Sequence, residues 1–389
     1  MSERTLVGLP LYEKESKEGI EITLGNIDDR LNELDIDSSV VIQLNGPETA
    51  AGNAPELTID HSKYNAEIEV IQSERLGQTR ALNDLISNAA AREIERAFMT
   101  DADIYRFPGS MKAMWEQGDR PVVGARYRPY PIEIVEAEFG ELALEERLLY
   151  QIFDGDQSPE VRKVLRQNGL DRTDWVKASL MLLEIDTVHG MHGNQHHVTD
   201  SVMNRTMGLE RSKIAGSAYF MHMGRVDMGD HIKARLRHFR GAAANNDLDN
   251  FLHKEILLPS EDAMNDIAQQ IRESTPDGDL FAMLYLSRCA IRERVNQICF
   301  DIATNEWNIN NLGEVNPTSM RDVRTFQDAK LAISRFFVDV DWDDVTGFAV
   351  GPPPVTQEHL RRPFNFERHL QDRKLAQSVM RTLGVEVLP

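Results

Sequence analysis

Cysteine is scarce in this chain, and its spacing argues against a disulfide or a metal site. The 389 residues include two cysteines, Cys289 and Cys299, ten positions apart in a segment with helical periodicity. On a helix this spacing separates the two residues by about 15 Å along the axis, too far for a disulfide bond. Neither cysteine has the spacing of a metal-binding pair, so we expect two buried thiols.

Long hydrophobic runs are also missing. No run of about 18 apolar residues occurs, so the sequence predicts no transmembrane helix. Residues 1–5 lead directly into a predicted strand and lack the apolar core of a signal peptide. We therefore expect a cytoplasmic protein that does not insert into a membrane.

Positive charge is in deficit. Lysine and arginine number 43 against 63 aspartates and glutamates, which gives a formal net charge of −20. Such a surface repels the phosphates of nucleic acids and anionic lipids, so we expect neither as a partner. The run HIKARLRHFR at 231–240 is a local exception. Its Arg235, Arg237, His238 and Arg240 could hold a diphosphate or an anionic acceptor, although a solvated helix face is the more common explanation.

The first half of the chain alternates between strand and helix patterns. Helical spacing predicts helices at 18–34 and 77–96. Apolar runs predict strands at 5–12, 39–44, 68–71, 97–100, 121–127, 178–185 and 214–221. This alternation favours an α/β fold with a mostly parallel sheet covered by helices.

The composition shifts near residues 241–246 (GAAANN), after which the pattern is mainly helical. Helices are expected after an N-cap at Ser260 and at 280–302, 319–337 and 357–383. We therefore expect two domains, an α/β domain over residues 1–240 and a helical C-terminal domain over 241–389.

A short acidic motif follows the predicted strand at 97–100. Asp101 and Asp103 flank Ala102, just where the apolar run ends. Ligands of open α/β sheets collect at the carboxyl ends of the strands. Carboxylates are the ligands that hard divalent cations prefer. The motif therefore suggests a cation that holds a diphosphate, although Asp-x-Asp also occurs in ordinary solvated turns.

Five motifs in order make the first 240 or so residues resemble the GT-A glycosyltransferases, especially family 2. They are the strand end from Gly8 to Glu13 (GLPLYE), Asn45-Gly46 after the second strand, Gly77 to Asn83 (GQTRALN), Asp101-Ala102-Asp103, and Asp200 before a helix with His222 after the next strand. The chain departs from the family in lacking an Asn before Glu13, in having Asn45 where an Asp is usual, and in having Thr199 where a Glu is more frequent.

The resemblance implies a GT-A fold and a metal-dependent hexosyltransferase that uses a UDP- or GDP-sugar as donor and a soluble acceptor. Residues 1–130 would bind the nucleotide sugar and 131–240 would form the acceptor side. The implied donor-binding residues are Pro10, Tyr12, Glu13, Asn45, Gly77, Arg80, Asn83, Asp101, Ala102 and Asp103. Asp101, Asp103 and His222 would hold Mn²⁺ or Mg²⁺. Asp200 would act as general base toward the acceptor hydroxyl.

Several of these residues also have ordinary structural explanations. Asp200 is a good helix N-cap, His222 could be a satisfied core histidine, and Arg80 could be a solvated residue of a first helical turn. The segment His189–His197 holds four histidines. It could bind a transition metal, form a flexible donor or acceptor loop, or be a polar surface loop.

Other functions remain open at this level. Residues 74–77, 101–104 and 361–366 resemble the mannosylglycerate synthases, which implies a retaining enzyme with a small carboxylated acceptor. A nucleotidyltransferase would need a glycine-rich basic loop after the first strand, and residues 9–13 supply none. A non-catalytic protein that binds nucleotide sugars is a further alternative. The apolar helix at 280–302 favours a C-terminal domain that shapes the acceptor site or mediates homo-oligomer formation.

Overall fold

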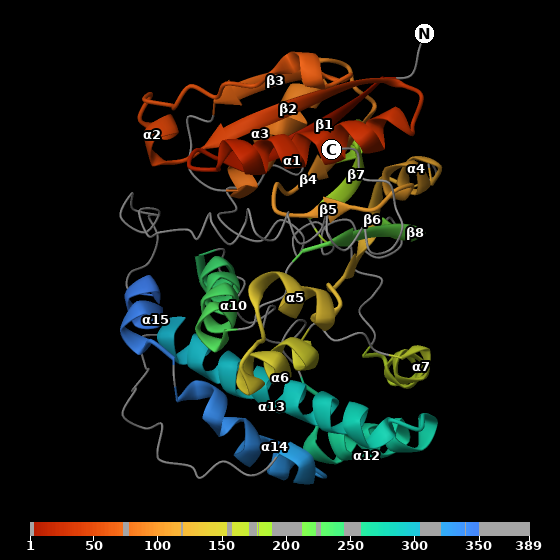
Figure 1. Cartoon of the computed structure of the whole chain (residues 1–389), viewed down its shortest axis with the longest axis vertical. Coiled ribbons are helices and arrows are strands. Elements are labelled where there is room, and N and C mark those ends of the chain that lie inside the picture. Colours follow the sequence, from red (N-terminus) through yellow and green to blue (C-terminus); the bar gives the residue numbers. More distant parts are fainter. Residues whose placement is uncertain are drawn as a thin grey trace. The chain divides into compact units, whose positions relative to one another are not determined.

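A computed structural model describes residues 4–72, 78–117, 120–153, 158–170, 177, 179–188, 212–222, 227–244, 258–303, 320–338 and 340–349 (Figure 1). The chain divides into two compact units. The described residues within Met1–Glu138 and Thr173–Met223 form the sheet unit. Those within Phe139–Arg172 and Gly224–Pro353 form the helical unit.

The sheet unit contains one eight-stranded sheet with the order β3-β2-β1-β4-β7-β6-β8-β5. Its strands are β1 (Arg4–Tyr12), β2 (Asp37–Asn45), β3 (Glu67–Gln72), β4 (Arg96–Thr100), β5 (Tyr105–Arg106), β6 (Val122–Arg128), β7 (Leu180–Glu184) and β8 (Ser212–Met221). The α/β class with flanking helices is confirmed.

The predicted mostly parallel sheet is wrong, because the sheet is mixed. The pairs β1–β2, β2–β3, β1–β4 and β6–β8 are parallel, whereas β4–β7, β6–β7 and β5–β8 are antiparallel. A buried apolar run such as Leu180–Glu184 has the same pattern whichever way the strand enters the sheet. Periodicity therefore predicts that β7 is a strand but not that it runs against its neighbours.

Side chains of the sheet and of the helices that cover it form two hydrophobic cores, one on each face of the sheet. One core includes residues of α1 (Lys17–Asn32) and α4 (Ser110–Trp115), and the other includes residues of α3 (Gln78–Ala91) and α8 (Ile185–Val188). The chain also forms α2 (Pro47–Ala50), α5 (Ile132–Phe139) and a 3-10 turn at His61–Lys63. Val7 and Leu9 of β1 belong to the same core cluster as Leu24 of α1. Leu6 belongs to the other core cluster, with Leu85 of α3. Alternate residues of β1 therefore serve opposite faces, as a strand covered on both sides requires.

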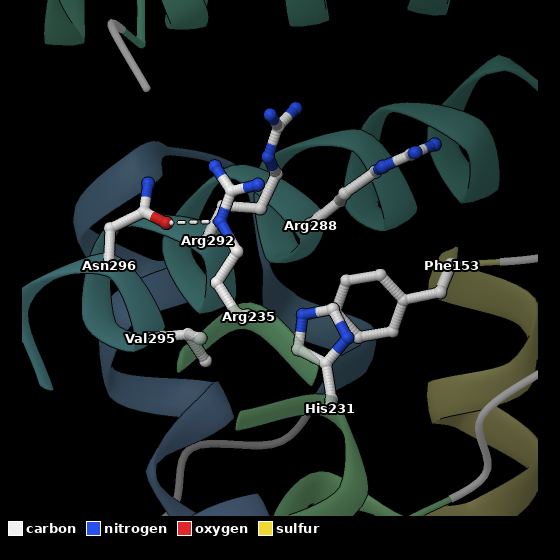
Figure 2. Close-up of a pocket in the computed structure, with 7 residues that line it drawn as sticks. All are labelled: Phe153, His231, Arg235, Arg288, Arg292, Val295 and Asn296. Carbon is white, nitrogen blue, oxygen red and sulfur yellow. Dashed lines mark hydrogen bonds between the residues drawn. The ribbon is translucent and has the colours of Figure 1, made fainter. Parts of the chain in front are cut away.

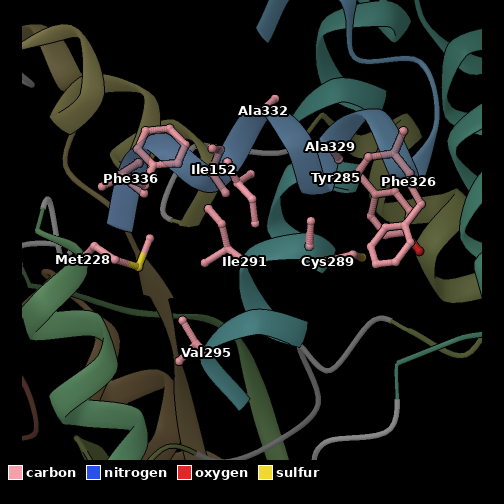
Figure 3. Close-up of a cluster of buried hydrophobic side chains, with 14 of the residues drawn as sticks. Ile152, Met228, Tyr285, Cys289, Ile291, Val295, Phe326, Ala329, Ala332 and Phe336 are labelled. Carbon is pink, nitrogen blue, oxygen red and sulfur yellow. The ribbon is translucent and has the colours of Figure 1, made fainter. Parts of the chain in front are cut away.

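The helical unit is built around one long helix, α13 (Gly278–Ala303). The other helices are α6 (Leu144–Phe153), α7 (Pro159–Gln167), α10 (Met228–Ala244), α12 (Glu261–Ser274), α14 (Phe326–Ala332) and α15 (Trp342–Ala349), with 3-10 turns at Met320–Asp322 and Ile333–Phe337. Helix α13 packs against α10, α12 and α14, and Figure 3 shows its Ile291 and Val295 among the buried side chains. Both cysteines are free and buried in α13, as predicted.

Capping residues explain where two helices of this unit begin. Ser260 caps α12, since its Oγ accepts a hydrogen bond from the Ala263 N–H at 3.3 Å, as predicted. The single helix predicted at 319–337 is wrong. Thr325 and Asp328 form a capping box that starts α14 in the middle of that range.

The domain division after residue 240 falls inside α10, and residues 350–389 lie outside the described ranges. Two domains with that boundary stay a prediction. Among the helices described above, none combines the length and the apolar character needed to cross a membrane.

Candidate functional site

The predicted donor-binding residues of β1 and β2 lie at one edge of the sheet. Tyr12 is the register partner of Asn45 at the ends of these parallel strands. The Glu13 N–H donates to the Asn45 carbonyl oxygen at 2.9 Å. Pro10 lies two residues earlier in β1, opposite Gln43. Strand β4 runs parallel on the other side of β1, so the acidic motif follows it at the same edge.

Glu13 holds the short helix α2, which follows β2 and Gly46. Its carboxylate accepts hydrogen bonds from the N–H and Oγ1 of Thr49, at 2.7 and 2.8 Å, and from the N–H of Glu48 at 3.1 Å. A Cβ atom at Gly46 would lie 2.1 Å from Glu13 Cδ. Glycine at 46 therefore leaves the space that the carboxylate fills. Direct contact of Glu13 with a nucleotide stays a prediction.

Tyr12 carries a phenol that stays neutral. Burial, and secondarily the neighbouring carboxylate of Glu13, raise the pKa of Tyr12 above its ordinary value. At neutral pH its hydroxyl can therefore both donate and accept hydrogen bonds at this edge.

The turn that carries the acidic motif is held by its backbone carbonyls. The guanidinium of Arg106 donates to the carbonyl oxygen of Asp101 at 2.5 Å and to that of Ile104 at 3.1 Å. Thr23 of α1 donates its hydroxyl to the carbonyl oxygen of Ala102 at 2.9 Å. Side chains thus fix three carbonyls of this turn, which pre-organises the backbone from which Asp101 and Asp103 project.

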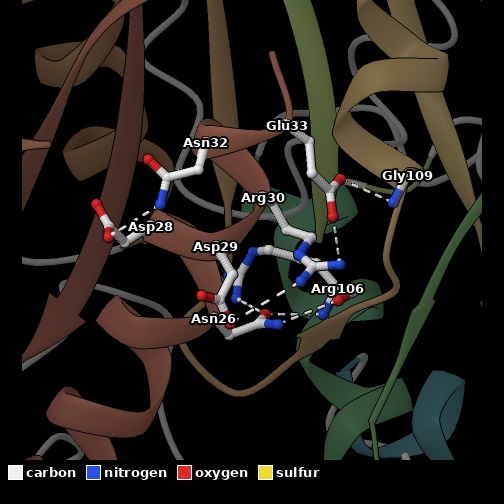
Figure 4. Close-up of polar contacts among 8 residues, drawn as sticks. All are labelled: Asn26, Asp28, Asp29, Arg30, Asn32, Glu33, Arg106 and Gly109. Carbon is white, nitrogen blue, oxygen red and sulfur yellow. Dashed lines mark hydrogen bonds and ion pairs between the residues drawn. The ribbon is translucent and has the colours of Figure 1, made fainter. Parts of the chain in front are cut away.

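Arg106 is itself fully buried and is anchored by two polar side chains. Its Nε and Nη2 donate to Thr100 Oγ1 at 3.0 and 2.6 Å. Asn26 Oδ1 accepts from the backbone N–H and from Nη1 of Arg106, at 2.9 and 3.2 Å, and Asn26 Nδ2 donates to the Arg106 carbonyl oxygen at 3.1 Å (Figure 4). Sequence reasoning missed Arg106, Asn26 and Thr23, because charged and polar residues are normally assigned to the surface.

Strand pairing brings His222 toward the acidic turn. Tyr105 of β5 pairs with Met221 of β8 in an antiparallel register. The next pair in that register would be Ile104 and His222, so the histidine follows β8 beside the segment that leads out of the motif. Its ring stacks on Tyr127 with centroids 4.5 Å apart.

The three predicted metal ligands do not form a ready-made metal site. The described ranges contain no group of three or more His, Cys, Asp or Glu side chains that could hold a metal ion. Two carboxylates and an imidazole match Mn²⁺ or Mg²⁺ in kind. The metal role of Asp101, Asp103 and His222 therefore stays a prediction.

The remaining predicted residues are only partly described. Asn83 is half-buried in α3, and Arg80 belongs to the first turn of that helix. Gly77, Asp200 and the segment His189–His197 lie outside the described residues. The structure therefore does not bear on the predicted general base or on the histidine-rich segment.

Comparison with known proteins does not name a family. No family model matches the chain, and no curated protein matches it. Among solved structures, one described as "Crystal Structure of a Mycobacterial Protein" aligns over 62% of this chain and 75% of that chain, with 13% identity and a TM-score of 0.36. A similarity of this size supports no conclusion about fold family or function.

Proposed function

We propose that the chain is a metal-dependent glycosyltransferase of the GT-A type, which moves a hexosyl group from a nucleotide-diphosphate sugar to a hydroxyl of a soluble acceptor. The observation that supports this most is the acidic turn. It follows β4 at the carboxyl edge that β4 shares with β1 and β2, and Arg106 and Thr23 hold its carbonyls. Ligands of α/β sheets bind at such an edge.

The ends of β1 and β2 would bind the donor nucleotide. Tyr12 and Asn45 lie side by side there, and both carry groups that can hydrogen-bond a base or a ribose. Asn83, which is half-buried in α3, and Arg80, in the first turn of that helix, would bind the donor as well. These assignments come from the order of the motifs, and the shared edge of the strands supports the first pair.

Asp101, Asp103 and His222 would hold Mn²⁺ or Mg²⁺ together with the diphosphate. When bound, the cation offsets the negative charge that develops on the leaving group. Since the three side chains are not gathered in this structure, they would have to come together when the ligand binds. Asp200 would take the proton from the acceptor hydroxyl.

A nucleotide panel tests this proposal. Thermal unfolding of the full chain is measured with UDP, GDP, dTDP or CDP, each with Mn²⁺ or with EDTA. A ligand that binds the native state raises the midpoint by mass action. We expect one nucleotide to stabilise the chain in Mn²⁺ but not in EDTA.

The variant Asp103→Asn should lose this stabilisation. The matched control is Glu56→Gln, which removes one exposed carboxylate from the sheet unit and should keep it. Absence of a metal-dependent shift with every nucleotide, or an equal loss in both variants, would refute the proposal.

A further inference from the structure

A small pocket lies wholly within the helical unit, and its walls are rich in cationic side chains. It encloses about 100 Å³ and is formed by α6, α10 and α13 (Figure 2). Its lining residues are Phe153, His231, Arg235, Arg288, Arg292, Val295 and Asn296. The proposed donor residues belong to the other unit, so this pocket is not part of the strand edge described above.

Helical spacing places the cationic side chains on one face of α13 and one face of α10. Arg288, Arg292 and Asn296 recur every four residues along α13, and His231 and Arg235 are four apart on α10. Residues spaced by four share a helix face. Arginine is always protonated in proteins, and like charges at this spacing repel each other. Three guanidinium groups around one small pocket, in a chain with a net charge of −20, therefore favour an anion between them.

Asn296 supplies a second, independent indication. Only 7% of its surface is exposed. Its Oδ1 accepts a hydrogen bond from Arg235 Nε at 3.0 Å, which fixes the orientation of the amide. The amide nitrogen, Nδ2, is buried and has no hydrogen-bond partner in the described part of the chain. A buried donor of this kind is costly unless a ligand accepts from it.

The other walls limit the size of what can enter. The His231 ring stacks on Phe153 with centroids 4.1 Å apart, and Val295 adds an apolar surface. Pockets for whole cofactors or drug-sized ligands are several times larger than this one. The volume therefore suits a single compact oxyanion group.

We propose that this pocket binds a phosphoryl group, presented either as inorganic phosphate or as the monoester of a small molecule. A phosphoryl group carries close to two negative charges at neutral pH and three acceptor oxygens. The guanidinium groups and the Asn296 amide nitrogen are all donors, which matches this ligand in charge and in hydrogen bonding. The site is independent of the proposed glycosyl transfer.

Calorimetric titration of the full chain tests the proposal, with inorganic phosphate and methyl phosphate as separate probes at constant ionic strength. Saturable binding of at least one probe is expected, and the tighter of the two identifies the source of the phosphoryl group. Arg292→Gln should weaken binding by about tenfold or more, because a charge-assisted hydrogen bond is lost. The control Arg237→Gln removes the same charge from an exposed position of α10 and should change the affinity less than about twofold.

A second variant guards against loss of the fold. Asn296→Asp keeps an acceptor for Arg235 Nε but replaces the amide donor by a negative charge, so it should abolish binding while the chain stays folded by circular dichroism. No saturable binding of either probe to the wild type would overturn the proposal. Equal weakening by Arg237→Gln and Arg292→Gln, or unchanged binding in Asn296→Asp, would overturn it as well.

Discussion

The guanidinium of Arg106 donates a hydrogen bond to the backbone carbonyl of Asp101 across 2.5 Å, from a side chain with no exposed surface. Burying a guanidinium is expensive unless its N–H groups find acceptors. Here Thr100, Asn26 and two carbonyls of the turn provide them. The same hydrogen bonds that satisfy the arginine therefore fix the backbone that carries the two aspartates.

Replacing Arg106 by lysine should lower the free energy of unfolding by about 2–4 kcal/mol, because lysine keeps the charge but cannot reproduce the planar fork of donors. Urea unfolding measures this loss. The control is Arg4→Gln, which breaks an exposed ion pair with Asp37 and should have little effect. Similar losses in the two variants would show that the buried hydrogen bonds of Arg106 stabilise the fold no more than an exposed ion pair does.

Thr23→Val should lower the affinity for the nucleotide in Mn²⁺ and should lower the free energy of unfolding only slightly. Valine has nearly the same shape but cannot donate to the Ala102 carbonyl, so we expect about 1 kcal/mol less stability. The turn would lose one of its fixed carbonyls, and nucleotide affinity should fall with it. Thr23→Ser retains the hydroxyl and should bind as the wild type does. Identical nucleotide affinities in the valine and serine variants would show that the hydrogen bond from Thr23 to the Ala102 carbonyl does not contribute to ligand binding.

Much of this sheet unit could be predicted from apolar periodicity alone. The runs that became β1, β2 and β4 are short, buried and bounded by turn residues, so their existence and order followed directly. The antiparallel direction of β7 could not be predicted, because a run of apolar residues looks the same whichever way the strand runs. The hydrogen bonds from Arg106 that hold the acidic turn could not be predicted either, since nothing in the sequence near Arg106 distinguishes a buried arginine from an exposed one. The pocket of the helical unit forms where α10 packs against α13. The basic run at 231–240 indicates a candidate anion site, but it does not show which helix lies against it.

Gly46→Ala should destabilise the connection between β2 and α2, because a Cβ there would lie 2.1 Å from Glu13 Cδ. We expect a loss of about 1–3 kcal/mol in the free energy of unfolding. In a Glu13→Ala background the clash disappears, so adding Gly46→Ala should cost much less. A double-mutant cycle measures the coupling between the two sites. Additive effects would contradict the contact.

The thiol of Cys299 should make stability fall at alkaline pH. Burial raises the pKa of Cys299 from 9.0 to about 12. Between these values the unfolded chain releases the thiol proton and the folded chain keeps it, so unfolding is favoured increasingly as pH rises. Cys299→Ala removes this contribution, and its stability should decline less steeply from pH 9 to pH 11 than that of the wild type. Parallel pH profiles would contradict the assignment.

The most direct test of glycosyl transfer at the sheet edge is the binding of Mn²⁺ itself, followed by electron paramagnetic resonance with and without the nucleotide that the thermal panel identifies. The proposed site predicts one bound Mn²⁺ per chain that depends on the nucleotide. This binding should be lost in Asp103→Asn and in His222→Gln, and kept in Glu56→Gln. Nucleotide-dependent Mn²⁺ binding that survives both site variants, or no such binding to the wild type, would contradict it.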